Sequence, residues 1–291
     1  MTDLTSARGS ESGAPPLGEI IQLMRQAHGR DLSVFDEAFL AKSLARRIEA
    51  SPCDTAAAYL ERLAQDGTEA DALLRSLNVS YSEFFRDPLA FALIEQQLLP
   101  GLMESAKQAG SNEIRVWSAG CATGQEAWSV AMLLDELTRT QDRPMAYRII
   151  ATDLSEPDLA FASAGVYSAE AVGNVRTCQL RECFLRQGTA FAIAPRLREH
   201  VTFSVFDLLS TQSRSPATSI YGGFDLVLCS NVLLYYGLQT QGLILNKLRR
   251  SMAAGGYLVV GETERAIVER TGGFRAVAAP ASVFDILNRA A

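Results

Sequence analysis

The stretch Val116-Trp117-Ser118-Ala119-Gly120-Cys121-Ala122-Thr123-Gly124-Gln125-Glu126 passes from an apolar strand through a tight turn into the start of a helix. Gly120 and Gly124 allow a sharp turn and a close approach of the backbone to a ligand. The helix start adds unpaired N–H groups. The stretch is neither the G-x-G-x-x-G fingerprint nor a Walker loop, because no Gly-Lys-Ser/Thr follows. Alone, it is as consistent with an ordinary strand–helix turn as with a ligand site.

Strands and helices alternate after this turn. Short apolar stretches typical of strands lie at 114–118, 148–152, 201–206, 224–230 and 257–260, with a helical run at 125–137. A last pair, 274–277 and 283–286, fits an antiparallel hairpin at a sheet edge. The alternation predicts an α/β fold with a doubly wound, mostly parallel sheet. Residues 165–200 interrupt the alternation, and we expect an inserted β-subdomain there.

The chain before the turn is helical in pattern. Apolar residues recur every three or four positions from residue 19 to 107, as in the stripe of Leu40, Leu44 and Ile48. Residues 1–18 are rich in Ser, Gly and Pro and predict a disordered leader. The expected organisation follows as four parts: a leader (1–18), a helical N-terminal domain (19–107), a linker (108–113) and an α/β domain (114–291).

Composition excludes several classes of function. The 291 residues carry 27 Lys+Arg and 33 Asp+Glu, a net charge of −6, which argues against a general nucleic-acid binder. No apolar run approaches the ~18 residues of a membrane span, so we expect no membrane insertion. The five cysteines form no C-x-x-C pair, and there are only two histidines. We therefore expect a cytoplasmic protein with no disulfide framework, no metal site and no histidine-based catalysis.

Polar side chains follow several of the expected strands. Asp153, Asp207 and the pair Ser230-Asn231 each lie where a strand ends, and Glu126 lies in the first turn of the helix after the glycine turn. In an open α/β sheet, ligands bind along the carboxyl ends of the strands. Each carboxylate also has an ordinary reading, as a loop residue or as a partner of the helix dipole. Together they suit a ligand with a ribose, an ammonium group and a purine, which describes S-adenosylmethionine.

These residues belong to motifs that resemble the CheR family of chemotaxis receptor methyltransferases, which are protein-glutamate O-methyltransferases. The resemblance covers about residues 19–287. It rests on four motifs in order: Ser82-Glu83-Phe84-Phe85-Arg86-Asp87-Pro88, Trp117 to Glu126, Ala151-Thr152-Asp153-Leu154-Ser155, and Cys229-Ser230-Asn231-Val232-Leu233-Leu234-Tyr235-Tyr236. It implies a class I methyltransferase-like, Rossmann-like domain joined to a small helical domain.

The resemblance also implies which residues bind S-adenosylmethionine. Glu126 would hold the methionyl amino group, Asp153 the ribose, and Asp207 with Leu208 the adenine. The full expected set is Ser80, Ser82, Arg86, Gly120, Glu126, Asp153, Asp207, Leu208, Ser230 and Asn231.

Arg86 and Tyr235 would flank the transferring methyl group and are the expected catalytic residues. A glutamate carboxylate has a pKa near 4.3 and is already ionised at neutral pH, so no general base is needed. Attack on a sulfonium destroys charge, and we therefore read Arg86 as a positioning contact. The alternative readings are a salt bridge from Arg86 to Glu83 or Asp87, and a core role for Tyr235.

The expected partners are methyl-accepting chemotaxis receptors, whose helices are rich in Glu. Lys42 and Arg46 are four residues apart on one helix face, opposite the apolar stripe, and would contact such helices. The alternative is a solvated face without a partner.

Several departures from the family pattern stand out. Ser80 and Ser82 replace the usual Asn and Thr, and Ser230 replaces a basic residue. The stretch 186–191 is short and has one glycine, so we expect no tether to a receptor's C-terminal pentapeptide. Two other functions stay open: a methyltransferase acting on another substrate, and a non-catalytic module that senses the cofactor.

Overall fold

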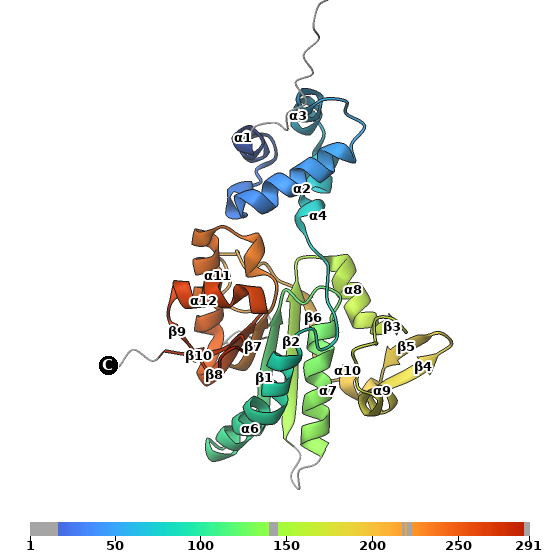
Figure 1. Ribbon diagram of the computed structural model, residues 1–291, viewed down its shortest axis with the longest axis vertical. Coiled ribbons are helices and arrows are strands. Elements are labelled where there is room, and N and C mark those ends of the chain that lie inside the picture. The colour runs from blue at the N-terminus through green and yellow to red at the C-terminus, as the bar shows by residue number, and fades with distance from the viewer. Residues whose placement is uncertain (1–16, 140–144, 217–218, 220–222, 288–291) are drawn as a thin grey trace, which may run out of the picture. The chain divides into compact units, whose positions relative to one another are not determined.

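The computed structural model describes residues 17–139, 145–216, 219 and 223–287 (Figure 1). The expected leader lies outside the described residues except for Leu17 and Gly18, which begin the first helix. The chain divides into two compact units, Met1–Val79 and Ser80–Ala291. Within the described ranges, no helix is both long and apolar enough to cross a bilayer.

The N-terminal unit is all helical, as its periodicity predicts. Its core is formed by the apolar faces of the helices, with the stripe residues Leu40 and Leu44 almost fully buried. Asp36, Thr55 and Asp66 accept hydrogen bonds from backbone N–H groups in the first turns of the helices they precede. The elements are α1 (Leu17–His28), η1 (Leu32–Val34), α2 (Glu37–Glu49), α3 (Ala56–Gln65) and α4 (Gly67–Leu77).

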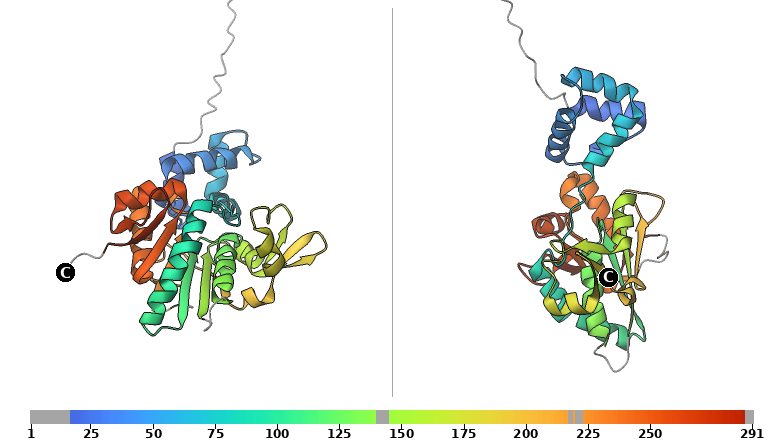
Figure 2. Two further views of the ribbon diagram at one scale, coloured as in Figure 1. Left: turned by 60° about the horizontal axis from the view of Figure 1, so that its bottom comes forward. Right: turned by 90° about the vertical axis from the view of Figure 1, so that its right-hand side faces the viewer.

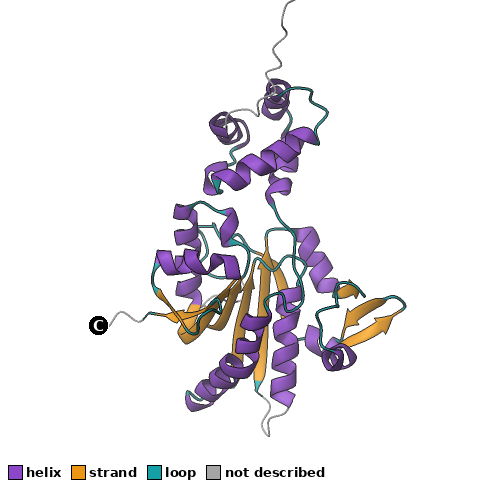
Figure 3. Ribbon diagram, in the orientation of Figure 1, coloured by secondary structure: helices purple, strands orange, loops and turns teal. Residues whose placement is uncertain are grey.

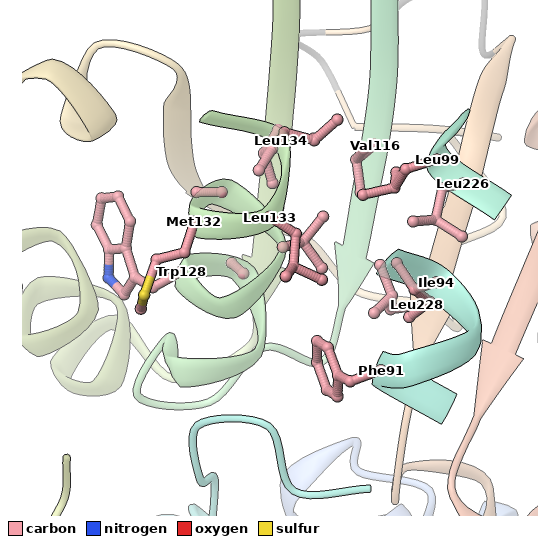
Figure 4. Packing of buried hydrophobic residues seen from close by; sticks show 14 of the residues in the cluster. Phe91, Ile94, Leu99, Val116, Trp128, Met132, Leu133, Leu134, Leu226 and Leu228 are labelled. Carbon is pink, nitrogen blue, oxygen red and sulfur yellow. The ribbon is translucent and has the colours of Figure 1, made fainter. Parts of the chain in front are cut away.

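The long helix that follows belongs to the second unit. It consists of α5 (Pro88–Leu93), a π-helical turn η2 (Ile94–Leu98) and α6 (Leu99–Gln108). Figure 4 shows its side chains Phe91, Ile94 and Leu99 among residues of the sheet and of α7 (Gln125–Arg139), in one buried cluster. The boundary between the units therefore lies before this helix. Our placement near residues 108–113 was too late, because periodicity predicts an apolar face but not which neighbour covers it.

The second unit is built on a seven-stranded sheet with the order β6-β2-β1-β7-β8-β10-β9. The first five in this order are parallel, and β10 and β9 form the antiparallel edge. This confirms the predicted α/β class (Figure 3). The strands are β1 (Glu113–Ala119), β2 (Ala146–Asp153), β6 (Val201–Val205), β7 (Phe224–Cys229), β8 (Met252–Val260), β9 (Phe274–Ala276) and β10 (Val283–Ile286).

Helices cover both faces of this sheet (Figure 2). Val116 in β1 packs with α5–α6 and α7, whereas its neighbour Trp117 packs with apolar residues of α11 (Leu238–Ser251) and α12 (Arg265–Thr271). Successive strand residues point to opposite faces, so a strand buried on both sides reads as a continuous apolar run. α8 (Glu156–Ala164) follows β2, and α10 (Pro195–Arg198) precedes β6.

A small antiparallel sheet is inserted between α8 and α10, where a β-subdomain was expected. Its order is β3-β5-β4. Ion pairs tie the insertion and its flanking α10 to the main body: Arg196 reaches Asp135 of α7 at 3.0 Å, and Arg176 reaches Glu95 of η2 at 2.7 Å. The insertion comprises β3 (Val166–Ser168), α9 (Thr177–Cys183), β4 (Phe184–Gln187) and β5 (Ala190–Ile193).

Candidate functional site

A cavity of about 270 Å³ lies at the carboxyl ends of β1, β7 and β8. It is at the point where the strand order reverses, with β2 on one side of β1 and β7 on the other. Ligands of open α/β sheets bind at such a point. Its walls are formed by residues of the segment 81–91, by Gly120, Cys121 and Glu126, and by residues at 228–231 and 259–263.

The glycine turn is held in an unusual backbone conformation. Gly120, Ala122 and Gly124 all have positive φ, at 76°, 45° and 91°. A Cβ atom at Gly124 would lie 2.7 Å from the Cβ of Ala162, so no side chain fits there. The N–H groups of Gly120 and Cys121 donate to the carbonyl of Thr152 at 2.8 and 3.0 Å. The end of β2 therefore shapes the turn.

Asp153 supplies the next restraint on the same turn. Its Oδ2 accepts the N–H of Ala122 at 2.9 Å, and its Oδ1 accepts the N–H of Ser155 at 3.0 Å. The side chain is partly buried and does not line the cavity. It is hydrogen-bonded to the glycine turn, and that turn lines the cavity through Gly120 and Cys121. Removing this carboxylate would release Ala122 from a conformation that L-residues rarely adopt.

Glu126 brings a carboxylate to the cavity wall from the first turn of α7. The hydroxyl of Ser118 donates to its Oε1 at 2.6 Å. Burial raises the pKa of Glu126. Hydrogen bonds from Ser118 and Ser230 and the positive charge of Arg86 act in the opposite direction and lower it, but burial has the larger effect. An ammonium group in the cavity would favour the ionised form, because a buried carboxylate needs a positive partner.

The segment 82–88 is anchored by two phenylalanines. Phe84 is fully buried between Tyr167 and Phe184, with ring centroids 4.9 and 5.6 Å away. Phe85 has φ 52°, and its N–H donates to the hydroxyl of Ser129 at 3.1 Å. These anchors place the next residue, Arg86, on the cavity wall.

Arg86 has no ion pair with Glu83 or Asp87 in the described part of the chain. Its guanidinium carbon lies 4.9 Å from the centroid of the Tyr81 ring. Asp87 caps α5 by accepting the N–H of Ala90 at 3.0 Å, and Glu83 accepts the hydroxyl of Tyr81. The alternative in which Arg86 forms a salt bridge with Glu83 or Asp87 is therefore wrong for the described residues.

The structure brings six of the expected cofactor residues to one cavity and places the other four outside its lining. Ser80 donates to the carboxylate of Asp158 on α8. Asp207 accepts the N–H of Leu209 at 2.7 Å, in a turn whose Ser210 carbonyl accepts from Lys247 at 2.5 Å. The cavity is lined by Ser82, Arg86, Gly120, Glu126, Ser230 and Asn231, and not by Ser80, Asp153, Asp207 or Leu208.

Tyr235 lies in the 3-10 turn η4 (Leu233–Tyr235), which follows Asn231 and its positive φ of 62°. It does not line the cavity either. Burial raises the pKa of its hydroxyl, and the positive charge of Arg86 acts in the opposite direction.

Glu264, which the sequence reading missed, holds two strand ends together. It is fully buried and accepts the N–H groups of Asn231, Gly261 and Leu234 at 2.7, 2.8 and 3.2 Å. A Cβ at Gly261 would lie 2.8 Å from Nδ2 of Asn231. Burial raises the pKa of Glu264. The only sequence signal was an acidic residue three positions after a glycine at a strand end.

In the N-terminal unit, Lys42 and Arg46 are exposed on α2. Their neighbour Arg47 differs, because its guanidinium makes two 2.7 Å hydrogen bonds to the buried carboxylate of Glu69. The exposed basic face of α2 therefore contains Lys42 and Arg46 and not Arg47.

A family model and several relatives that are similar to this chain are all described as methyltransferases. A family model described as CheR methyltransferase, SAM binding domain, matches residues 80–283. The chain is 32% identical over 204 residues to chemotaxis protein methyltransferase 1 of Pseudomonas aeruginosa, covering 69% of this chain and 71% of that protein. It is 27% identical over 244 residues to a chemotaxis protein methyltransferase of Listeria monocytogenes, covering 84% and 87%.

A longer protein is also similar. An uncharacterized 104.1 kDa protein in the hypE 3′ region of Rhodobacter capsulatus is 29% identical over 275 residues, which is 94% of this chain. The chain spans only 28% of that protein. The same sequence pattern therefore also occurs within a much larger polypeptide.

Proposed function

Because the chain belongs to the CheR family of S-adenosylmethionine-dependent methyltransferases, we propose that it methylates glutamate side chains of chemotaxis receptor helices, forming glutamyl methyl esters. The observation that carries this proposal is the meeting of Arg86 and Glu126 on the wall of one cavity. Glu126 offers a negative site for the cofactor, and Arg86 offers a positive site for an incoming carboxylate.

The residues around the cavity fit S-adenosylmethionine. The buried carboxylate of Glu126, whose pKa is raised, would hold the methionyl ammonium group. Gly120 would allow the cofactor to approach the turn closely, and Ser230 with Asn231 would line its other side. Asp153, Asp207 and Leu208 lie outside the cavity lining; Asp153 would hold the ribose, and Asp207 with Leu208 would lie at the adenine, where the cofactor extends beyond this cavity. When bound, the cofactor supplies a methyl group activated by the adjacent sulfonium.

The protein's own contribution is alignment. A glutamate carboxylate arrives ionised, so no side chain needs to remove a proton. Arg86, stacked on Tyr81, would hold one carboxylate oxygen, and the hydroxyl of Tyr235 would orient the group. Correct placement of two reactants can contribute on the order of 7–11 kcal/mol to the lowering of the barrier. Charge disappears as the ester forms, so Arg86 positions the nucleophile and does not stabilise a developing charge.

The receptor would meet the basic face of α2. Lys42 and Arg46 are exposed there and would attract a helix rich in Glu. We propose no additional tether to a C-terminal pentapeptide. β4 ends at Gln187 and β5 begins at Ala190, so only Gly188 and Thr189 connect them, and a turn this short offers no extended glycine-rich loop.

The test is the chemistry of the product. The protein is incubated with S-adenosylmethionine labelled in the methyl group and with a receptor cytoplasmic fragment, and the labelled fragment is then treated with base. Release of labelled methanol is expected, because esters hydrolyse in base. A base-stable label would contradict the ester and favour another substrate group. Tight cofactor binding with no transfer would favour a non-catalytic sensing module.

A further inference from the structure

Tyr167 connects the inserted sheet to the glycine turn. It lies in β3, its ring is 2% exposed, and its hydroxyl donates to the carbonyl oxygen of Thr123 at 2.8 Å. Thr123 lies between Ala122 and Gly124, both of which have positive φ. The turn is thus held from two sides, by Asp153 at the N–H of Ala122 and by Tyr167 at the carbonyl of Thr123.

The same ring also contacts the segment that brings Arg86 to the cavity wall. Phe84, two residues before Arg86, meets the Tyr167 ring edge-on, with centroids 4.9 Å apart and planes at 80°. Phe161 of α8 meets it in a similar way at 5.6 Å. One side chain therefore contacts the cofactor turn through its hydroxyl and the Arg86 segment through its ring.

Ion pairs connect the inserted sheet to helices of the main body. Arg176 pairs with Glu95 of η2 at 2.7 Å, and Arg196 of α10, which follows β5, pairs with Asp135 of α7 at 3.0 Å. Both partners lie on helices packed against the main sheet. A hydroxyl on a loosely attached hairpin would not restrain the glycine turn. The Tyr167 hydroxyl can restrain it, because ion pairs hold the inserted sheet to the main body.

We propose that Tyr167 is a positioning residue for methyl transfer, and that the three-stranded insertion is part of the scaffold that sets the geometry of the cofactor pocket. The hydroxyl fixes the turn that receives the cofactor, and the ring fixes the segment that carries Arg86. This inference rests on the proposed S-adenosylmethionine site.

Two substitutions separate the contributions of the hydroxyl and the ring. Tyr167→Phe removes the hydroxyl, with its hydrogen bond to Thr123 and its interaction with the Trp128 side chain, and Tyr167→Leu removes the aromatic contact with Phe84 as well. The matched control is Tyr147→Phe. Tyr147 in β2 is also buried, and among the described residues its hydroxyl has no hydrogen-bond partner. Each variant is compared with the wild type by calorimetric titration with S-adenosylmethionine, by kcat at saturating cofactor and by thermal unfolding.

The Tyr167→Phe variant should bind S-adenosylmethionine roughly three- to tenfold more weakly, which is the range for one lost hydrogen bond, with kcat changed less than the Kd. The Tyr167→Leu variant should also lose kcat, because Arg86 is displaced. An unchanged Kd in Tyr167→Phe, or an equal loss in Tyr147→Phe, would overturn the proposal, even if Tyr167→Leu does not fold. Failure of the wild type to bind the cofactor would instead contradict the proposed function.

Discussion

Replacing Asp153 with alanine should weaken S-adenosylmethionine binding by a predictable amount. The carboxylate accepts two backbone N–H groups, from Ala122 at 2.9 Å and from Ser155 at 3.0 Å. Hydrogen bonds to charged groups contribute about 1.5–3 kcal/mol each. Because Asp153 is only partly buried, we take the lower value, which gives about 3 kcal/mol of unfolding free energy lost.

Binding should weaken by a similar amount. Asp153→Ala loses the proposed ribose contact and also releases Ala122 from its φ of 45°. A loss of about 2–3 kcal/mol corresponds to roughly a 30- to 150-fold rise in Kd. Isothermal titration calorimetry measures the Kd, and thermal unfolding measures the stability. Asp153→Asn keeps one accepting oxygen and should fall between the wild type and Asp153→Ala.

Asp225 offers a matched control. It is a partly buried aspartate on β7 whose Oδ2 accepts the N–H of Arg115 at 2.8 Å, and it does not line the cavity. Asp225→Ala should lower the unfolding temperature and leave the Kd for S-adenosylmethionine within about twofold of the wild type. The reasoning is refuted if Asp153→Ala binds the cofactor normally, or if both variants lose affinity equally.

Three further predictions concern the charged side chains. Burial raises the pKa of Glu126 above 4.5, and only the ionised form attracts an ammonium, so cofactor affinity should fall as the pH drops through that raised pKa. The stability of the cofactor-free protein should depend on pH in the opposite direction. Its native state holds this proton more tightly than the unfolded state, so the contribution of Glu126 to stability falls as the pH rises from 4.5 through the raised pKa. Glu126→Gln should remove both dependences, measured by calorimetry and by unfolding across the pH series; a wild-type pH profile in the variant would contradict this. Arg86→Ala should lower kcat roughly 10- to 100-fold with a much smaller change in cofactor Kd, and Arg86→Lys should rescue little because an ammonium cannot stack on the Tyr81 ring as the planar guanidinium does; full rescue by Lys would show that charge alone suffices. Arg46→Glu should raise the receptor KM and leave the cofactor Kd unchanged, whereas Arg75→Glu, the same reversal at an exposed site on α4, should leave the receptor KM unchanged; equal effects would remove the basic face of α2 from the account.

The architecture of the second unit could be predicted because its strands are short and buried on both faces. The strand expected at 224–230 and the helix expected at 125–137 agree with β7 and α7 to within a few residues. The glycine turn was identified by the same local pattern, since its shape depends on residues close in sequence. Local periodicity and turn chemistry are sufficient for features of this kind.

The features that could not be predicted all depend on distant contacts. The helix from Pro88 to Gln108 shows an apolar face, but only the folded chain shows that β1 and α7 cover it. The carboxylate of Glu264 holds the ends of β7 and β8 together because three backbone N–H groups from two separate segments converge on it. Nothing near Tyr167 in the sequence indicates that its hydroxyl reaches Thr123, which is 44 residues away.

The most direct test of the account is transfer of a labelled methyl group to one receptor cytoplasmic fragment in two forms. One form keeps the glutamates of the methylated helices, and the other has those glutamates replaced by glutamine. We predict stoichiometric, base-labile labelling of the glutamate form and none of the glutamine form, since an amide cannot accept the methyl group as an ester. Equal labelling of both forms, or no labelling of either while S-adenosylmethionine binds, would contradict the central claim that this protein esterifies receptor glutamates.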